Sequence, residues 1–221
     1  MRNGLFLVLL FLAIRLNAQV GVKFQVTYQD RALALNDTLT DSVTQEKIVF
    51  KTVKFYISNP ELVNGNQVIC SDPKPFHLLD LEFPESLSWN LPCAKTGFSA
   101  FRFGFGIDSL TNVSGAFGDD LDPVNGMYWA WQSGYINCKL EGYASFSTAR
   151  DHAFEYHLGG YSGIQKAYQT VVFPVGKTNQ LTVLLDLEAF IRQVDMQHLS
   201  HLMSPSETAA KLALVLSQSF E

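Results

Sequence analysis

Apolar and polar residues alternate with a period of two in several short runs along the chain. The apolar members of these runs are Val22, Phe24 and Val26; Val53, Phe55 and Ile57; Phe101, Phe103, Phe105 and Ile107; Ile136, Cys138 and Leu140; and Phe154, Tyr156 and Leu158. Such alternation is typical of β-strands that bury one face, and clusters of Asn, Gly, Pro and Asp separate the runs. The pattern predicts an all-β fold, an antiparallel β-sandwich that is immunoglobulin-like or barrel-like.

The C-terminal end changes to helical spacing. From about residue 187, apolar residues recur at helical intervals: Leu187, Phe190, Ile191 and Val194. Further on, the run Ser204-Pro205-Ser206-Glu207 reads as a capping box with proline at the first helical position, and it predicts a helix to about Ser217. The apolar face of that helix contains Ala209, Leu212, Ala213 and Leu216. We expect a short helical appendage that covers part of the sheet.

The first 18 residues have the layout of a secretory signal peptide. Arg2 precedes an apolar run over residues 4–12, and the small residue Ala18 offers a cleavage site. That run is too short to cross a bilayer comfortably, and no later segment predicts a transmembrane helix. We therefore expect residues 19–221 to form a single domain that is periplasmic, secreted or held at the cell surface.

The chain is acidic, with a formal net charge of -5 over 221 residues. Loss of Arg2 and Arg15 with the signal peptide makes the remaining chain more acidic still. This balance disfavours nucleic acid and anionic membranes as partners, because both repel an acidic surface. A negative net charge is compatible with a protein that binds cations.

Three cysteines follow the predicted cleavage site. Cys70 and Cys93 lie in turn-rich segments and form the natural disulfide pair in an exported protein. Cys138 shares the parity of Ile136 and Leu140 on its strand, which predicts a buried, inert thiol. The spacing of the three does not resemble a zinc site.

Two of the three tryptophans, Trp129 and Trp131, stand one residue apart. In a β-strand this spacing places both indoles on one face. An uninterrupted strand would give them the face of Lys139 and Glu141, whereas a bulge at Gly134 would switch that parity. Core packing and a partly exposed aromatic site both remain open interpretations.

His157 is the first candidate metal ligand, because it lies on the polar parity of its strand and neutral imidazole suits copper or zinc. The alternative is an ordinary hydrogen-bonded histidine. His152, in a polar turn, is a weaker candidate. His198 and His201 are three residues apart, and without a completing carboxylate or cysteine motif they are interpreted as a solvated surface.

The segment from Gly118 to Gly126 is rich in oxygen ligands. Asp119, Asp120, Asp122 and Asn125 offer the hard donors that calcium prefers, although the spacing is not that of an EF-hand. The alternative is a turn that uses Asp, Pro, Asn and Gly for their backbone preferences. A third function class, a calcium-stabilised structural module, rests on this segment.

Enzyme signatures are absent from the sequence. It contains no Gly-x-Ser-x-Gly, no phosphate-binding glycine loop and no zinc-protease helix motif. We therefore expect a protein that is not an enzyme.

Five segments, in order, resemble the MbnP-like copper-binding proteins. The strand Lys54–Leu62 resembles the family's FYVSN-x-x-L strand, and His77–Glu82 resembles its ALLDFE segment. Phe103–Asp108 followed by Asn112 resembles F-x-LGV…N. The run Gly126–Tyr135 resembles the MFWxWQxGY core, and Tyr156–Gly159 resembles the HLG segment. The matches extend from about residue 22 to residue 160.

The resemblance implies a periplasmic or surface protein of a bacterial copper-handling system associated with methanobactin. Some members of the family bind copper through histidines and a tryptophan oxidised to kynurenine by a di-haem partner of the peroxidase type. By this resemblance Trp129, Trp131 and His157 become candidate metal-site residues. Two departures stand out: Val113 occupies a position where relatives often carry histidine, and Gly159-Gly160-Tyr161 lacks the family's terminal cysteine.

The leading expectation is an exported, non-catalytic copper-binding protein with one further donor near Trp129 or Trp131. The rival belongs to another class, an exported sandwich that binds a glycan or a protein through its aromatic face without metal. Val113 favours the rival, because a histidine at that position would complete the family's site.

Overall fold

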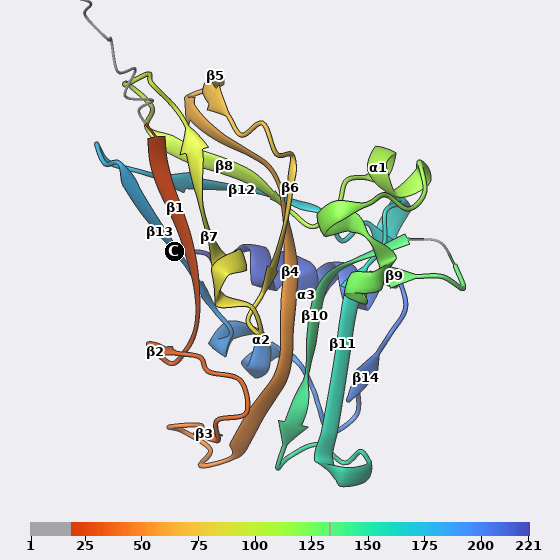
Figure 1. The fold of residues 1–221 in the computed structure, drawn as a ribbon. Helices are drawn as coiled ribbons and strands as arrows, with labels where there is room; N and C mark the ends of the chain where they lie inside the picture. The colour runs from red at the N-terminus through yellow and green to blue at the C-terminus, as the bar shows by residue number, and fades with distance from the viewer. Residues whose placement is uncertain (1–18, 133) are drawn as a thin grey trace, which may run out of the picture.

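The structure is a computed structural model that describes residues 19–132 and 134–221. The predicted signal peptide, residues 1–18, lies outside the described residues. The regular structure of the described chain consists mainly of strands in two sheets, with few helices, and the larger sheet curls into a half-barrel (Figure 1). The all-β class and the C-terminal helices are therefore confirmed.

The smaller sheet has four strands around β1. Its members are β1 (Gln19–Tyr28), β2 (Arg31–Ala32), β7 (Ser88–Pro92) and β13 (Gln180–Asp186). β13 and β1 run parallel, with Phe24 opposite Val183. The expectation of a purely antiparallel sandwich is therefore wrong for this sheet, because the C-terminal part of the chain returns beside its first strand.

The larger sheet has ten strands, and the 18-residue strand β4 (Lys47–Asn64) is its centre. The order along the sheet is β12-β8-β4-β10-β11-β14, and β3, β5 and β6 also pair with β4 while β9 pairs with β10. The bounds of these strands are β3 Leu39–Thr40, β5 Gln67–Ser71, β6 Phe76–Asp80, β8 Ala100–Phe105, β9 Tyr128–Trp129, β10 Gly134–Ala144, β11 Ala153–Gly159, β12 Gln169–Pro174 and β14 His201–Leu202. β11 and β14 run parallel, so this sheet is also mixed.

The strand periodicity predicted from the sequence places the main core. Phe24, Phe55, Phe103, Leu140 and Phe154 are fully buried in one apolar cluster that joins both sheets and the C-terminal helices. Burying each large side chain contributes roughly 1.5–3 kcal/mol, so this cluster dominates the stability of the fold.

Two helices lie in the C-terminal part of the chain. α2 (Glu188–Gln193) and α3 (Glu207–Ser217) bury the predicted apolar faces, including Phe190 and Leu212. α3 begins later than the capping box predicted, because Ser206, not Ser204, is the N-cap: its hydroxyl accepts a hydrogen bond from the backbone N–H of Ala209 at 3.0 Å. None of the helices in the described residues is long and apolar enough to cross a membrane.

A second, smaller core lies on the other face of β4. Tyr56 and Ser58 on that face are fully buried, although their polar parity predicted exposure. The chain between β8 and β10 covers Tyr56, whose hydroxyl donates to the carbonyl oxygen of Asp120 at 2.9 Å. This covering segment carries α1 (Ser109–Val113) and two short 3-10 turns, η2 (Asp119–Leu121) and η3 (Pro123–Asn125). Trp129, Met127 and Tyr135 belong to this smaller core. The covering segment therefore positions the tryptophan hairpin.

The disulfide prediction is confirmed. Cys70 at the end of β5 and Cys93 after β7 are bonded with a Cα–Cα distance of 5.7 Å. The bond ties the larger sheet to the smaller one. Cys138 is a free, fully buried thiol, and burial raises its pKa.

Candidate functional site

The two tryptophans lie on a hairpin and not along one strand. β9 ends at Trp129, and the chain turns before β10 pairs back, with Gly134 opposite Trp129. Trp129 is buried with 5% of its surface exposed, whereas Trp131 is 67% exposed on the turn. Their ring centroids are 6.3 Å apart. The expectation that both share a strand face is therefore wrong, because the strand stops between them.

The sequence suggested a bulge at Gly134 that would switch the faces of the strand, and the structure places an irregularity two to four residues later. The register between β10 and β11 shifts between Ile136 and Cys138. The intervening residue, Asn137, is fully buried, and its Oδ1 accepts a hydrogen bond from the N–H of Ile107 at 3.0 Å. This irregularity lets the hairpin bend over β11.

Trp129 packs directly on Gly159 of β11. A Cβ atom at position 159 would lie 2.7 Å and 2.8 Å from two atoms of the indole and 2.5 Å from the carbonyl oxygen of Tyr135. The indole can therefore occupy this place only because residue 159 has no side chain. His157 is two residues earlier on the same strand and points to the same face. The structure thus brings Trp129 and His157 to neighbouring positions on one face of β11.

Glu141 fixes the imidazole of His157. The Nε2 atom of His157 lies 2.7 Å from Oε1 of Glu141, and His157 is only 6% exposed. Thr52 donates its hydroxyl to Oε2 of Glu141 at 2.9 Å, and Nζ of Lys139 lies 3.6 Å from Oε1. The hydrogen bond from His157, followed by that from Thr52, lowers the pKa of Glu141 to about 2.

An ionised Glu141 has a defined consequence for the ring. A carboxylate only accepts hydrogen bonds, so in the neutral form of His157 the ring hydrogen is on Nε2. In that tautomer Nδ1 carries the lone pair, and Nδ1 has no hydrogen-bond partner among the residues that the structure describes. Metal-ligating histidines are commonly oriented by a carboxylate in this way.

The indole N–H of Trp129 is buried and has no hydrogen-bond partner within the described chain. An unpaired buried donor costs about 1–3 kcal/mol, so this position is unfavourable for packing alone. The indole N–H donates and cannot accept, so an unmodified Trp129 forms a wall of the site and does not ligate a metal through Nε1.

Across 19–132 and 134–221, no three side chains among His, Cys, Asp and Glu lie close enough to hold a metal together. Val113, at the position where relatives often carry histidine, is 64% exposed at the end of α1. The preceding Asn112 is buried, and its Oδ1 accepts the backbone N–H of Tyr135 at 2.8 Å. Asn112 therefore anchors the covering segment to the hairpin, and an exposed valine follows it.

The other histidines lie elsewhere. Nδ1 of His152 lies 2.8 Å from the carbonyl oxygen of Ser147 in a turn. His198 pairs with Asp195 at 2.7 Å, and His201 pairs with Glu155 at 3.4 Å, on exposed surface. His77, which the sequence reasoning did not single out, stacks on Trp89 with centroids 4.0 Å apart. The only sequence feature that could have identified His77 is its position in a strand.

Asp120, Asp122 and Asn125 of the acidic segment make hydrogen bonds within the fold. Asp120 accepts the backbone N–H of Leu78 and pairs with Lys74, each at 2.8 Å. Asp122 caps η3, and Asn125 donates its side-chain N–H groups to the carbonyl oxygens of residues 119 and 120. The Asp and Asn side chains in these contacts are therefore explained by their roles in the turns. Calcium binding here stays a prediction.

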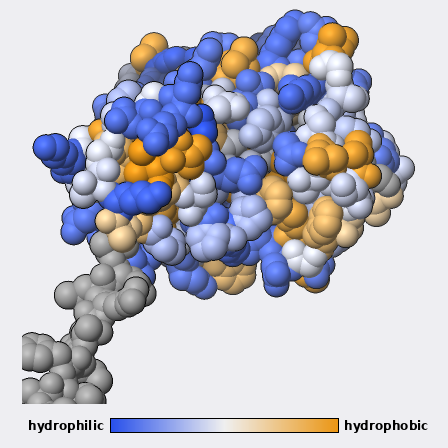
Figure 2. Space-filling view, turned by 90° about the horizontal axis from the view of Figure 1, so that it is seen from above, coloured by the Kyte–Doolittle hydropathy of each residue, from blue (hydrophilic) through white to orange (hydrophobic). Residues whose placement is uncertain are grey.

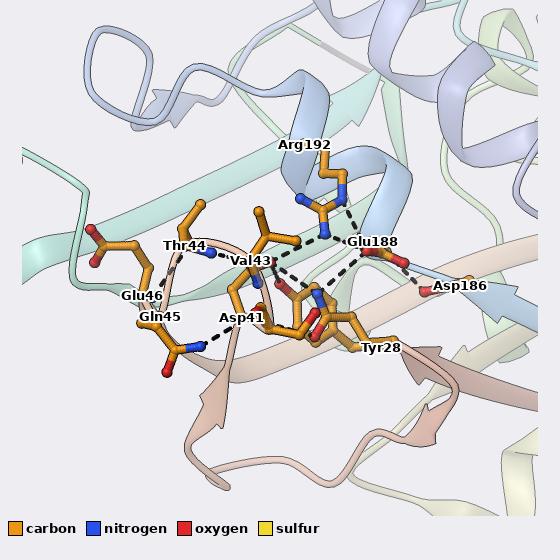
Figure 3. Close-up of polar contacts among 11 residues, drawn as sticks. Tyr28, Asp41, Val43, Thr44, Gln45, Glu46, Asp186, Glu188 and Arg192 are labelled. Carbon is orange, nitrogen blue, oxygen red and sulfur yellow. Dashed lines mark hydrogen bonds and ion pairs between the residues drawn. The ribbon is translucent and has the colours of Figure 1, made fainter.

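A buried polar cluster lies around Asp41, far from the hairpin (Figure 3). Its carboxylate accepts the hydroxyl of Tyr28 at 2.7 Å and the backbone N–H groups of Val43 and Thr44 at 2.9 Å and 2.8 Å. Arg192 lies 3.6 Å away. The backbone hydrogen bond from Thr44 is the largest cause of a pKa lowered to about 2. The carboxylate is satisfied by the fold, which indicates a structural role.

Comparison with known proteins gives two matches. The sequence profile of the MbnP family matches residues 17–205. The fold is similar to MbnP from Methylosinus trichosporium, with a TM-score of 0.61 and 15% sequence identity over 85% of this chain and 81% of that one. A search of curated proteins finds no match.

Proposed function

The chain belongs to the MbnP family, and we propose that it is an exported, non-catalytic protein that binds copper in copper handling or storage. One observation carries the proposal: a histidine oriented by a carboxylate lies beside a buried tryptophan on one face of β11. The proposed location is the periplasm or the cell surface, in keeping with the signal peptide expected over residues 1–18.

The donor set fits a metal that accepts few ligands. Because the described residues contain no group of three protein donors, a tetrahedral zinc site is not expected here. Imidazole is a suitable copper ligand. In this proposal His157 supplies Nδ1, Glu141 orients the ring, and the second donor comes from the hairpin that carries Trp129 and Trp131.

Oxidation of one tryptophan would supply that donor. With two equivalents of hydrogen peroxide, a di-haem partner of the peroxidase type would cleave the C2–C3 bond of the indole, place one oxygen atom on each carbon and release two waters. One water then hydrolyses the N-formyl group, which leaves as formate, and the product is kynurenine. The product carries an aromatic amine in place of the indole N–H, and this nitrogen has a lone pair. We include Trp129 and Trp131 in the proposed metal site on this basis.

Copper stoichiometry of two matched variants tests the proposal. His157→Ala should reduce bound copper(I) from about one per chain to a small fraction. His201→Ala is the control, because His201 also pairs with a glutamate through Nε2 but lies on exposed surface. Loss of copper in the control alone, or equal binding by wild type and His157→Ala, would contradict the assignment.

A second candidate is an interaction module that binds a glycan or a protein without metal. The exposed indole of Trp131, which lies on the turn beside Trp129, favours it, because exposed aromatic rings stack on sugars and on apolar side chains. His157→Ala separates the two candidates. It should remove bound copper if the metal proposal holds, and it should leave partner binding through Trp131 unchanged in the interaction module.

A further inference from the structure

Two hollows lie side by side on the surface of the covering segment, one on each side of Asp119 and Asp120. The first has a volume of about 340 Å³ and is walled by Phe76, Phe117 and Leu121. The second has a volume of about 420 Å³ and is walled by Leu78, Phe83 and Val124. Asp119 and Asp120 line both hollows, so two carboxylates separate two apolar recesses.

Both hollows expose aromatic rings to solvent. Phe117 is 45% exposed and Phe83 is 51% exposed. Thr111 of α1 lines the first hollow, and Leu110 and Val113 on the same helix are exposed. On the side of the molecule where α1 lies, Figure 2 shows apolar surface interrupted by polar surface. Exposed apolar patches with polar borders are typical of interaction sites.

The charge around the two hollows is net negative. Three carboxylates, those of Asp80, Asp119 and Asp120, line the hollows together with two lysines. The two lysines that line the hollows are already paired, Lys74 with Asp120 and Lys54 with Asp80, both at 2.8 Å. The carboxylate of Asp119 is exposed and has no hydrogen-bond or ion-pair partner within the residues that the structure describes. The uncompensated charge between the hollows is therefore that of Asp119.

We propose that the two hollows and Asp119 form a docking site for an extended segment of a basic partner protein. In that segment a lysine or arginine is flanked by two apolar side chains. Alternate residues of an extended chain share one face at roughly 7 Å spacing, so one segment presents apolar, basic and apolar groups in a row. The basic group pairs with Asp119, and the apolar groups enter the hollows. The site requires no metal, so it is independent of the proposed copper site.

Titration with a defined peptide tests this docking site. The probe is the fluorescently labelled peptide Ser-Leu-Ser-Arg-Ser-Leu-Ser, and its matched analogue carries Gln in place of Arg. Binding is followed by anisotropy, and the perturbed backbone amides are mapped by NMR on the full mature chain. We expect the Arg peptide to bind at least about tenfold more tightly than the Gln peptide and to weaken as salt rises.

Asp119→Asn is the key variant, because asparagine tolerates the positive φ of 55° at this position. It should reduce affinity for the Arg peptide by about tenfold, as should Phe117→Ser. Asp151→Asn is the matched control, an exposed aspartate with φ of 58° in a different turn, and it should bind like wild type.

Three results would each overturn the proposal. The first is equal binding of the Arg and Gln peptides, or no binding of either at millimolar concentration. The second is wild-type affinity in Asp119→Asn. The third is perturbation of amides that lie away from both hollows.

Discussion

His157 and Glu141 belong to adjacent strands, and Nε2 of the imidazole lies 2.7 Å from Oε1 of the carboxylate. The two positions are diagonal neighbours in the register, because His157 is opposite Lys139. The carboxylate therefore selects one tautomer of the ring and directs the lone pair of Nδ1 away from itself. This relationship is the basis of the proposed copper site.

Replacing Glu141 should weaken copper binding without removing the ligand. Glu141→Gln lacks the negative charge that holds the Nε2–H tautomer, so we expect affinity for copper(I) to fall by about 10–100-fold. Competition with a coloured copper(I) chelator measures the change. Glu155→Gln, which faces His201, is the control and should bind like wild type. Unchanged affinity in Glu141→Gln would exclude an orienting role for this carboxylate.

Adding one methyl group at Gly159 should displace the tryptophan hairpin. Gly159→Ala places Cβ 2.7 Å from the indole of Trp129, and we expect it to lower the free energy of unfolding by about 1–3 kcal/mol. Tryptophan emission should shift as Trp129 becomes more exposed. Gly176→Ala, where a Cβ meets no atom within 4 Å, is the matched control. A Gly159→Ala protein with wild-type stability and emission would show that the indole does not rest on this strand as described.

Acid should destabilise the fold partly through Asp41 (Figure 3). Its folded pKa of about 2 lies below the ordinary value of 3.8, so its stabilising contribution is complete above about pH 4. The contribution disappears as the pH falls through 2. Asp41→Asn should lose about 1–3 kcal/mol at pH 6 and show a smaller further loss on acidification than wild type. Urea unfolding at pH 6, 4 and 2.5 measures both slopes, and parallel slopes would contradict the assignment.

The cysteines should react in a fixed order. Burial raises the pKa of Cys138, so the native chain should not react with iodoacetamide. Unfolding without reductant should expose one reactive thiol, and unfolding with reductant should expose three. Intact mass after alkylation counts the modified residues. Reaction of Cys138 in the native chain would contradict its complete burial.

The sequence pattern predicted the strands that bury one face in the main core. Phe24, Phe103 and Leu140 alternate with polar or glycine positions because each strand has one face against the other sheet. The pattern did not predict the burial of Tyr56 and Ser58, because segments far along the chain cover that face of the strand. Alternation along a strand predicts burial of its apolar face. It does not show whether a later segment of the chain covers the other face.

The pairing of strands that are distant in the sequence also could not be predicted from the sequence. The parallel alignment of β1 with β13 depends on contacts between the two ends of the chain. The candidate site was also only partly predictable from the sequence. His157 and Trp129 were identifiable by residue type, but Glu141 and Gly159 acquire their roles only from cross-strand geometry. The turn that follows Trp129 and carries Trp131 was not predicted, because a two-residue spacing fits a strand and a hairpin equally.

The most direct test of the copper proposal is intact mass together with metal analysis of the chain purified from its native export route after copper exposure. We predict about one copper per chain, and formation of kynurenine at Trp129 or Trp131 would add about 4 Da to the mass. A chain that carries no copper and has an unmodified mass would contradict the account, and the search would then turn to glycan and protein partners.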